Sequence, residues 1–89
     1  MANTKSALKA IRVSERKRQQ NKPIRTGVRT RIKQAEKLIA RSDEPAARQA
    51  VILAVSALDK AANKGVIHRN NAARRKSRLM KKLNAILAQ

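Results

Sequence analysis

The chain has 89 residues with no Cys, Phe, Trp or Tyr, and its 23 basic and five acidic residues give a formal net charge of +18. This length suits one small domain, whose core has to come from Ala, Val, Ile, Leu and Met. The absence of Cys excludes disulfides and thiolate metal sites, and two Gly and two Pro are too few for a turn-rich β fold.

The first predicted helix begins near Thr4 or Ser6, either of which can cap it. Its apolar edge is weak, and between residues 12 and 23 Val13 is the only large apolar side chain. Such a stretch has no face to bury against its own protein, so it either projects into a partner or is disordered when free.

Pro23 and Gly27 interrupt a helical pattern. Inside a helix, Pro costs about 3 kcal/mol or more and Gly roughly 1 kcal/mol relative to Ala. The first helix therefore either breaks here or is kinked, and we favour the kink. Apolar residues at steps of three and four follow at once, and they form one stripe: Ile24, Val28, Ile32, Ala35, Leu38 and Ile39. Arg25, Arg29 and Lys33 fall on the opposite side, together with Thr26 and Thr30.

The second predicted helix has Ser42 or Asp43 as its cap and Pro45 in its first turn, and it runs to about Asn63. We interpret its apolar face as core rather than as a site. This face contains Ala47, Val51, Ala54, Val55, Leu58, Ala61 and Ala62, and Leu53 and Ala57 widen it.

Gly65 marks the end of the second helix, because the residue after a helix often needs a positive φ that Gly adopts freely. Val66 and Ile67 can fold back onto that helix, and the polar residues 68–71 can cap the next one. The third helix is predicted from about Asn70 to Ala88. One side of it carries Ala72, Leu79, Met80, Leu83, Ile86 and Leu87. Lys76 lies within this side, where we expect its stem to pack and its ammonium group to reach the edge.

These elements predict an all-α fold, a three-helix bundle with a long, basic, projecting N-terminal helix. We expect a single domain over residues 1–89, with a basic helical arm at 1–23 and the bundle at 24–89. Residues 1–33 carry eleven Lys and Arg against one acid, residues 34–63 carry four of each sign, and residues 64–89 carry eight cations and no acid. A neutral middle between two cationic ends indicates a folded unit whose ends meet a polyanion.

The chain offers little for catalysis, since it has one His, no Cys nucleophile and no Gly-rich phosphate loop. We therefore expect no enzyme, no cofactor, no metal site and no small-molecule substrate. No apolar run is long enough for a membrane span, no signal peptide is evident, and basic helices that lie on membranes usually carry Trp or Phe. We expect a soluble, cytosolic protein.

Without aromatic side chains to stack on bases, the protein should recognise backbone, grooves and shape. Two classes fit this expectation: an RNA-binding structural module of a ribonucleoprotein, and a DNA-compacting architectural (nucleoid-type) protein. The second usually shows symmetry or a dimer seam, whereas this chain has one lopsided arm, so we do not expect it to homo-oligomerise.

Several sequence segments resemble one known family. They are Met1-Ala2-Asn3, Lys5-Ser6-Ala7, Lys64-Gly65-Val66-Ile67-His68-Arg69-Asn70, Ala72-Ala73-Arg74 and Lys76-Ser77-Arg78-Leu79. In this combination, and from end to end, the chain resembles the bacterial small-subunit ribosomal protein S20 family. Pro23 with Gly27 departs from the uninterrupted first helix of that family.

The resemblance implies a three-helix bundle with a long first helix, located in the cytoplasmic 30S subunit beside other small-subunit components. It implies direct binding to 16S ribosomal RNA, at the 5′ domain and at the long penultimate helix. By position it assigns RNA contact to Lys5, Ser6, Lys64, His68, Arg69, Asn70, Arg74 and Arg78. With the other basic and polar groups of the helices and the corner, the candidate RNA-binding residues are Lys5, Ser6, Lys9, Arg12, Arg16, Lys17, Lys22, Arg25, Arg29, Lys64, His68, Arg69, Asn70, Asn71, Arg74, Arg75, Arg78 and Lys82.

Overall fold

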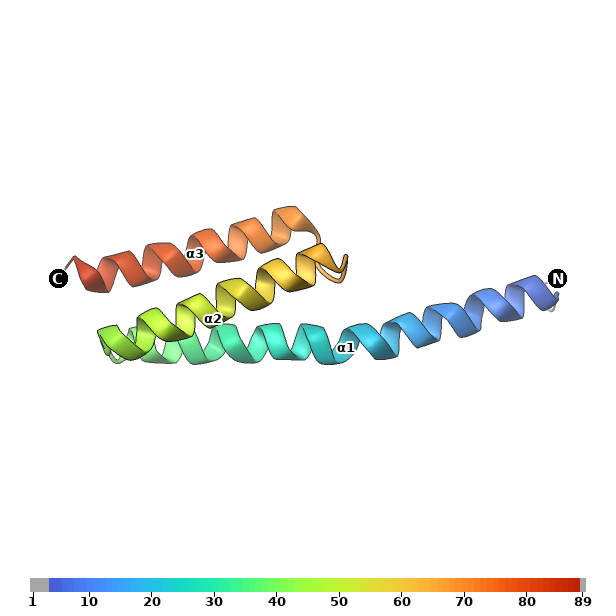
Figure 1. The fold of residues 1–89 in the computed structure, drawn as a ribbon, viewed down its shortest axis with the longest axis horizontal. Coiled ribbons are helices and arrows are strands. Elements are labelled where there is room, and N and C mark those ends of the chain that lie inside the picture. Colours follow the sequence, from blue (N-terminus) through green and yellow to red (C-terminus); the bar gives the residue numbers. More distant parts are fainter. Residues whose placement is uncertain (1–3, 89) are drawn as a thin grey trace.

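A computed structural model describes residues 4–88 as three helices, α1 (Lys5–Ala40), α2 (Glu44–Asn63) and α3 (Arg69–Leu87), with no strand in that range. α2 runs back along the C-terminal half of α1, and α3 runs back along α2 (Figure 1). The N-terminal half of α1 extends beyond both, so the molecule measures 63 × 19 × 17 Å. The predicted all-α bundle with a long first helix is confirmed.

Two of the three helix starts are capped by side chains. The Thr4 hydroxyl accepts a hydrogen bond from the Ala7 N–H at 3.3 Å, and His68 Nδ1 accepts one from the Asn70 N–H at 3.1 Å. Asp43 holds the N-cap position of α2, yet its side chain makes no capping bond. The start of α2 therefore depends on the fixed φ of Pro45 and on the charge of Glu44 near the positive helix end.

Gly65 ends α2 in the manner predicted from the sequence. Its φ is +74°, its N–H donates to the Ala62 carbonyl at 3.0 Å, and the Val66 N–H donates to the Ala61 carbonyl at 3.0 Å. These two bonds satisfy carbonyls that the helix end would leave free. Val66 is then buried in the core, which confirms that the corner folds back onto α2.

The corner after α1 repeats this backbone pattern with a different residue. Ser42 has φ +56°, its N–H donates to the Ile39 carbonyl at 2.9 Å, and the Asp43 N–H donates to the Leu38 carbonyl at 3.2 Å. Ser42 thus terminates α1, which the sequence did not indicate. Because a Cβ disfavours positive φ, Ser42 should lower the free energy of unfolding by about 1 kcal/mol relative to a glycine at the same position.

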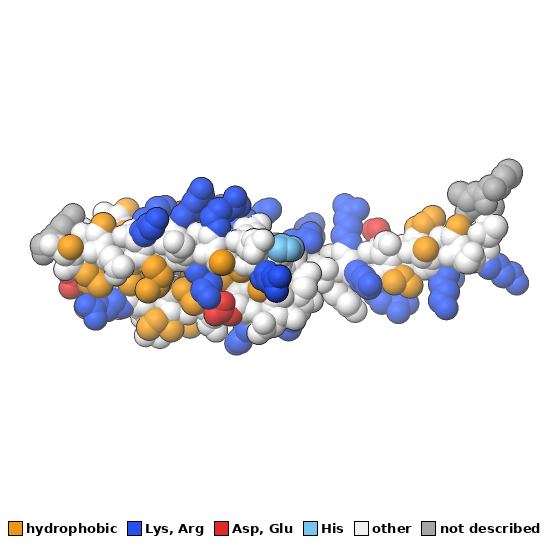
Figure 2. Space-filling view, turned by 90° about the horizontal axis from the view of Figure 1, so that it is seen from above, with side chains coloured by type: hydrophobic (Ala, Val, Ile, Leu, Met, Phe, Trp, Pro, Cys, Tyr) orange, Lys and Arg blue, Asp and Glu red, His pale blue; other side chains and the backbone are white. Residues whose placement is uncertain are grey.

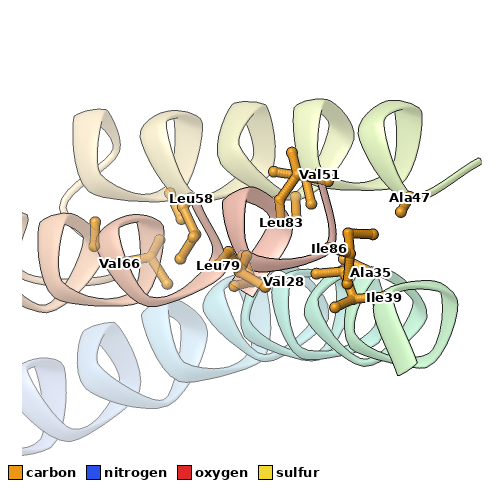
Figure 3. Packing of buried hydrophobic residues seen from close by; sticks show 13 residues of the cluster. Val28, Ala35, Ile39, Ala47, Val51, Leu58, Val66, Leu79, Leu83 and Ile86 are labelled. Atoms are coloured by element: carbon orange, nitrogen blue, oxygen red, sulfur yellow. The ribbon is translucent and has the colours of Figure 1, made fainter. Parts of the chain in front are cut away.

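The core lies between the three helices and consists of small and branched aliphatic side chains (Figure 3). No polar or charged residue is buried within residues 4–88, and Lys76 is only half-buried, as expected. Two residues that the sequence places on apolar faces are not buried: Met80 is 45% exposed and Leu53 is 40% exposed. The buried residues are Val28, Ala35, Ile39, Ala47, Val51, Ala54, Leu58, Ala61, Val66, Ala72, Leu79, Leu83 and Ile86.

α1 passes through Pro23 without a break, so of the two alternatives the broken helix is excluded. Its axis changes direction near the middle of the helix, where the projecting half leaves the bundle (Figure 1). Within residues 4–22 no side chain is buried, and the first buried residue of the helix is Val28. The bend therefore falls where α1 stops having neighbours.

Candidate nucleic-acid interface

A groove of about 310 Å³ lies between α1 and α3, and it is strongly cationic. Arg29 and Lys33 are four residues apart on α1, and Arg78 and Lys82 are four apart on α3, so each pair projects from one helix face. Ile32 and Leu79 supply the apolar lining. The remaining lining residues are Glu36 and Arg75. We call this set the α1–α3 groove; in Figure 2, Lys and Arg side chains form a row along one edge of the bundle.

One of the five cations in the α1–α3 groove is engaged by an acid. Lys82 Nζ lies 3.1 Å from Glu36 Oε1, and both side chains are about half exposed. The only other ion pair in residues 4–88 joins Lys76 Nζ to Asp59 Oδ1 at 2.8 Å, on the other side of α3. The remaining four groove cations therefore keep their charge available for an anionic ligand: Arg29, Lys33, Arg75 and Arg78.

The projecting half of α1 carries a second cationic surface. Lys5, Lys9, Arg12 and Arg16 are spaced four, three and four residues apart, which places them on one side of a helix. We call these four residues the arm stripe; all are exposed. Lys17 and Lys22 lie outside this stripe and are also exposed, so basic groups surround the arm (Figure 2).

The junction between arm and bundle gathers several predicted residues. Arg25 Nη2 donates to the Val66 carbonyl at 3.5 Å, which links α1 to the α2–α3 corner and places a guanidinium group there. Lys64, His68 and Arg69 are exposed at this corner. His68 has a structural task, since its Nδ1 caps α3 and only the rest of its ring is available for another contact.

Not every predicted residue is equally placed for a contact. Asn71 is half-buried, and its Oδ1 is buried without a hydrogen-bond partner, so that oxygen does not face a ligand. Arg74 is exposed but does not line the α1–α3 groove, whereas its neighbour Arg75 does. Ser6 and Asn70 are exposed near helix starts.

Lys33 lines the groove but was absent from the predicted set. Its position four residues after Arg29 could have identified it, because the two share one face of α1. Glu36 was missed as well, and no sequence signal pairs it with Lys82, which is 46 positions away.

Metal sites and membrane-spanning helices are both absent from the part of the chain that the structure describes. Residues 4–88 contain no group of three His, Cys, Asp or Glu side chains able to hold a metal ion. Among these residues no helix is long and apolar enough to cross a membrane. What the helices do present is cationic: a groove and an arm, both with unpaired Arg and Lys. This fold and this surface define a helical protein that binds a polyanion.

Comparisons with known proteins identify the family. Residues 2–84 match the family described as Ribosomal protein S20. A protein of Thermomicrobium roseum is 55% identical over 87 residues, which span 98% of this chain and 88% of the relative. One from Geobacillus kaustophilus is 51% identical over 88 residues, 99% of each chain, and one from Dehalococcoides mccartyi is 51% identical over 84 residues, 94% of this chain and 96% of the relative. All three are named small ribosomal subunit protein bS20. The chain belongs to the ribosomal protein S20 family.

Proposed function

We propose that the chain is a structural protein of the bacterial small ribosomal subunit, in the cytoplasm, and that it binds 16S ribosomal RNA directly. Membership of the S20 family supports this role, and that family consists of structural ribosomal proteins rather than enzymes. Nothing in the comparisons supports the DNA-compacting alternative. The observation that carries the proposal of direct binding is the α1–α3 groove with its four unpaired cations.

The proposed RNA contacts divide between two parts of one domain. The arm, residues 1–23, binds through the arm stripe and its neighbours, and the bundle, residues 24–89, binds through the α1–α3 groove and the α2–α3 corner. The length of 63 Å lets these parts reach RNA segments that are far apart. We assign the segments to the 5′ domain and the long penultimate helix of 16S RNA.

Exposed Arg and Lys side chains on rigid helices suit this task for two reasons. Each neutralised phosphate releases counterions, which provides affinity without base readout. An Arg fork can hold a phosphate through two parallel hydrogen bonds, which fixes orientation as well as charge. Since the chain has no aromatic residue, the shape of the folded RNA provides the specificity.

A salt titration tests the proposal. If roughly 8–10 phosphates are contacted, the affinity for a 16S 5′-domain fragment should fall by about three to five decades between about 50 and 200 mM salt. A duplex DNA of equal length, titrated at the same salt, serves as the control and should bind more weakly. A nearly flat salt dependence, or equal affinity for DNA, would contradict the proposal.

Three residues of α3, Arg74, Lys76 and Arg78, separate phosphate contact from packing. Arg78→Ala and Arg74→Ala should each lower RNA affinity and reduce the salt slope by about one unit, while the free energy of unfolding changes by less than about 0.5 kcal/mol. Lys76→Met should cost little RNA affinity, because the Lys76 ammonium group already pairs with Asp59. It should leave the free energy of unfolding unchanged or slightly raised, because an exposed ion pair contributes little and the half-buried stem is replaced by an apolar side chain. If Lys76→Met lowered affinity as much as Arg78→Ala, the assignment of faces on α3 would be wrong.

A further inference from the structure

The middle of α2 presents an uncharged surface. Residues 49–58 contain no charged side chain, although the chain as a whole carries 28 charged residues in 89. Ile52 is 61% exposed and Leu53 is 40% exposed within this segment. Contiguous exposed apolar surface of this kind marks an interaction site.

Ile52 belongs to a groove between α2 and α3, which has a volume of about 690 Å³, whereas Leu53 lies on the side of α2 that faces α1. Ile52 and Val55 line it from α2, and Met80 and Leu87 line it from α3. Asp59 lies one turn beyond Val55, and the ion pair of Asp59 with Lys76 marks the end of the apolar part. In Figure 2 apolar side chains are visible on the side of the bundle opposite the row of Lys and Arg.

We propose that this α2–α3 groove binds an amphipathic helix of an acidic protein partner. The charges of the groove argue for the acidic partner. Its lining contains Arg48 and Lys60 without an ion-pair partner, whereas its single acid, Asp59, is already paired with Lys76. Arg48 and Lys60 are twelve residues apart, about 18 Å along α2, so carboxylates toward both ends of a bound helix of three to four turns would meet them.

The walls of the groove argue for a helix. Both walls are helices whose backbone groups are bonded internally, so the groove offers no backbone partners to an extended strand. A bound helix satisfies its own backbone and needs only apolar contact, and a flexible Met at the rim adapts to such ridges.

Other occupants fit this groove less well. RNA would place phosphates against residues 49–58, which carry no charge themselves, and it would leave the apolar side chains between Arg48 and Lys60 without apolar contacts. A second copy of the chain would bring together two molecules of charge +18, whose repulsion opposes the contact.

The test uses the full-length protein and a labelled synthetic peptide of about 20 residues, with Leu at helical spacing on one face and Glu on its flanks. A peptide of the same composition, with Leu spread around the helix, controls for charge. Binding is measured by fluorescence anisotropy at about 0.3 M salt, where screening suppresses diffuse attraction. Ile52→Glu is compared with Ile11→Glu, because both isoleucines are 61% exposed and the charge change is identical. Met80→Glu is a second variant of the groove.

We expect the patterned peptide to bind at least about tenfold more tightly than the control peptide, and Ile52→Glu and Met80→Glu to remove at least about tenfold of that affinity. Ile11→Glu should change it by less than about twofold. Equal binding of the two peptides, or equal effects of Ile52→Glu and Ile11→Glu, would overturn the proposal. It would also fail if Ile52→Glu weakened RNA binding by more than about tenfold relative to the unchanged protein, or dissociated a dimer in sedimentation, because RNA or a second copy would then cover the groove.

Discussion

Residues 5–22 and residues 24–40 belong to one continuous helix, yet the two halves differ in how much of their surface is buried. The first half carries seven cations and one acid, and the second carries five cations and one acid. No side chain is buried in the first half, whereas Val28, Ala35 and Ile39 are buried in the second. Charge therefore does not distinguish them; an apolar stripe does.

The comparison shows which half of α1 contributes to the stability of the folded protein and which half lacks tertiary contacts. Helical stability in a protein comes mainly from the packing of an apolar face, and isolated helices are marginal in water. The second half of α1 has such packing against α2 and α3. The arm has no buried side chain, so we expect bound RNA to supply the rest of its stabilisation.

The largest expected effect distinguishes a leucine of the bundle from a leucine of the arm. Leu58 is fully buried, so Leu58→Ala should lower the free energy of unfolding by about 2–5 kcal/mol through lost burial and a cavity. Leu8 is 46% exposed, and Leu8→Ala should change it by less than about 0.5 kcal/mol. Urea unfolding followed by circular dichroism measures both. Similar losses in the two variants would mean that the arm packs against the bundle.

A smaller effect tests the corners that hold the bundle together. Gly65→Ala should lower the free energy of unfolding by about 1–2 kcal/mol, because a Cβ disfavours φ of +74°. Ser42→Gly should raise it by up to about 1 kcal/mol, since Ser42 occupies the same conformation without the freedom of glycine. Thermal unfolding of both variants checks the signs. A lower free energy of unfolding in Ser42→Gly would show that another interaction of the Ser42 side chain outweighs the strain of its backbone.

The smallest effect concerns the boundary between the two halves of α1. A Cβ added at Gly27 meets no heavy atom within 4 Å, so Gly27→Ala should stabilise the free protein by about 0.5–1 kcal/mol. If RNA approaches this face closely, the same variant should bind RNA more weakly; if not, its affinity should be unchanged. A destabilised Gly27→Ala would contradict the exposed, unstrained helix seen here.

Much of the fold could be predicted because local signals agreed. The apolar steps, the cap at Thr4 and the positive φ of Gly65 each depend on neighbours in sequence, and the structure confirms all three. Met80 and Leu53 were misplaced because periodicity gives the direction of a helix face but not its width, which the neighbouring helices decide.

The candidate site was less predictable, because it depends on how the helices are rotated against each other. The sequence identified which residues are basic, but it did not show that Arg29 and Lys33 face Arg75 and Arg78 across one groove. Nor did it reveal the pairing of Lys82 with Glu36. The effect of Pro23 could not be predicted, because a cost of about 3 kcal/mol can either break or bend a helix. Which of the two occurs depends on the free energy gained when residues 24–39 pack against α2 and α3, and the sequence does not show that packing.

Hydrogen exchange with and without RNA tests the central claim most directly. In the free protein, amides 10–22 should exchange with little protection, while the amides of buried positions in α1, α2 and α3 are protected by the stability of the whole bundle. Adding a 16S fragment that contains the proposed binding regions should slow exchange in residues 10–22 most of all. Strong protection of residues 10–22 in the free protein, or no change there when RNA binds, would contradict the account.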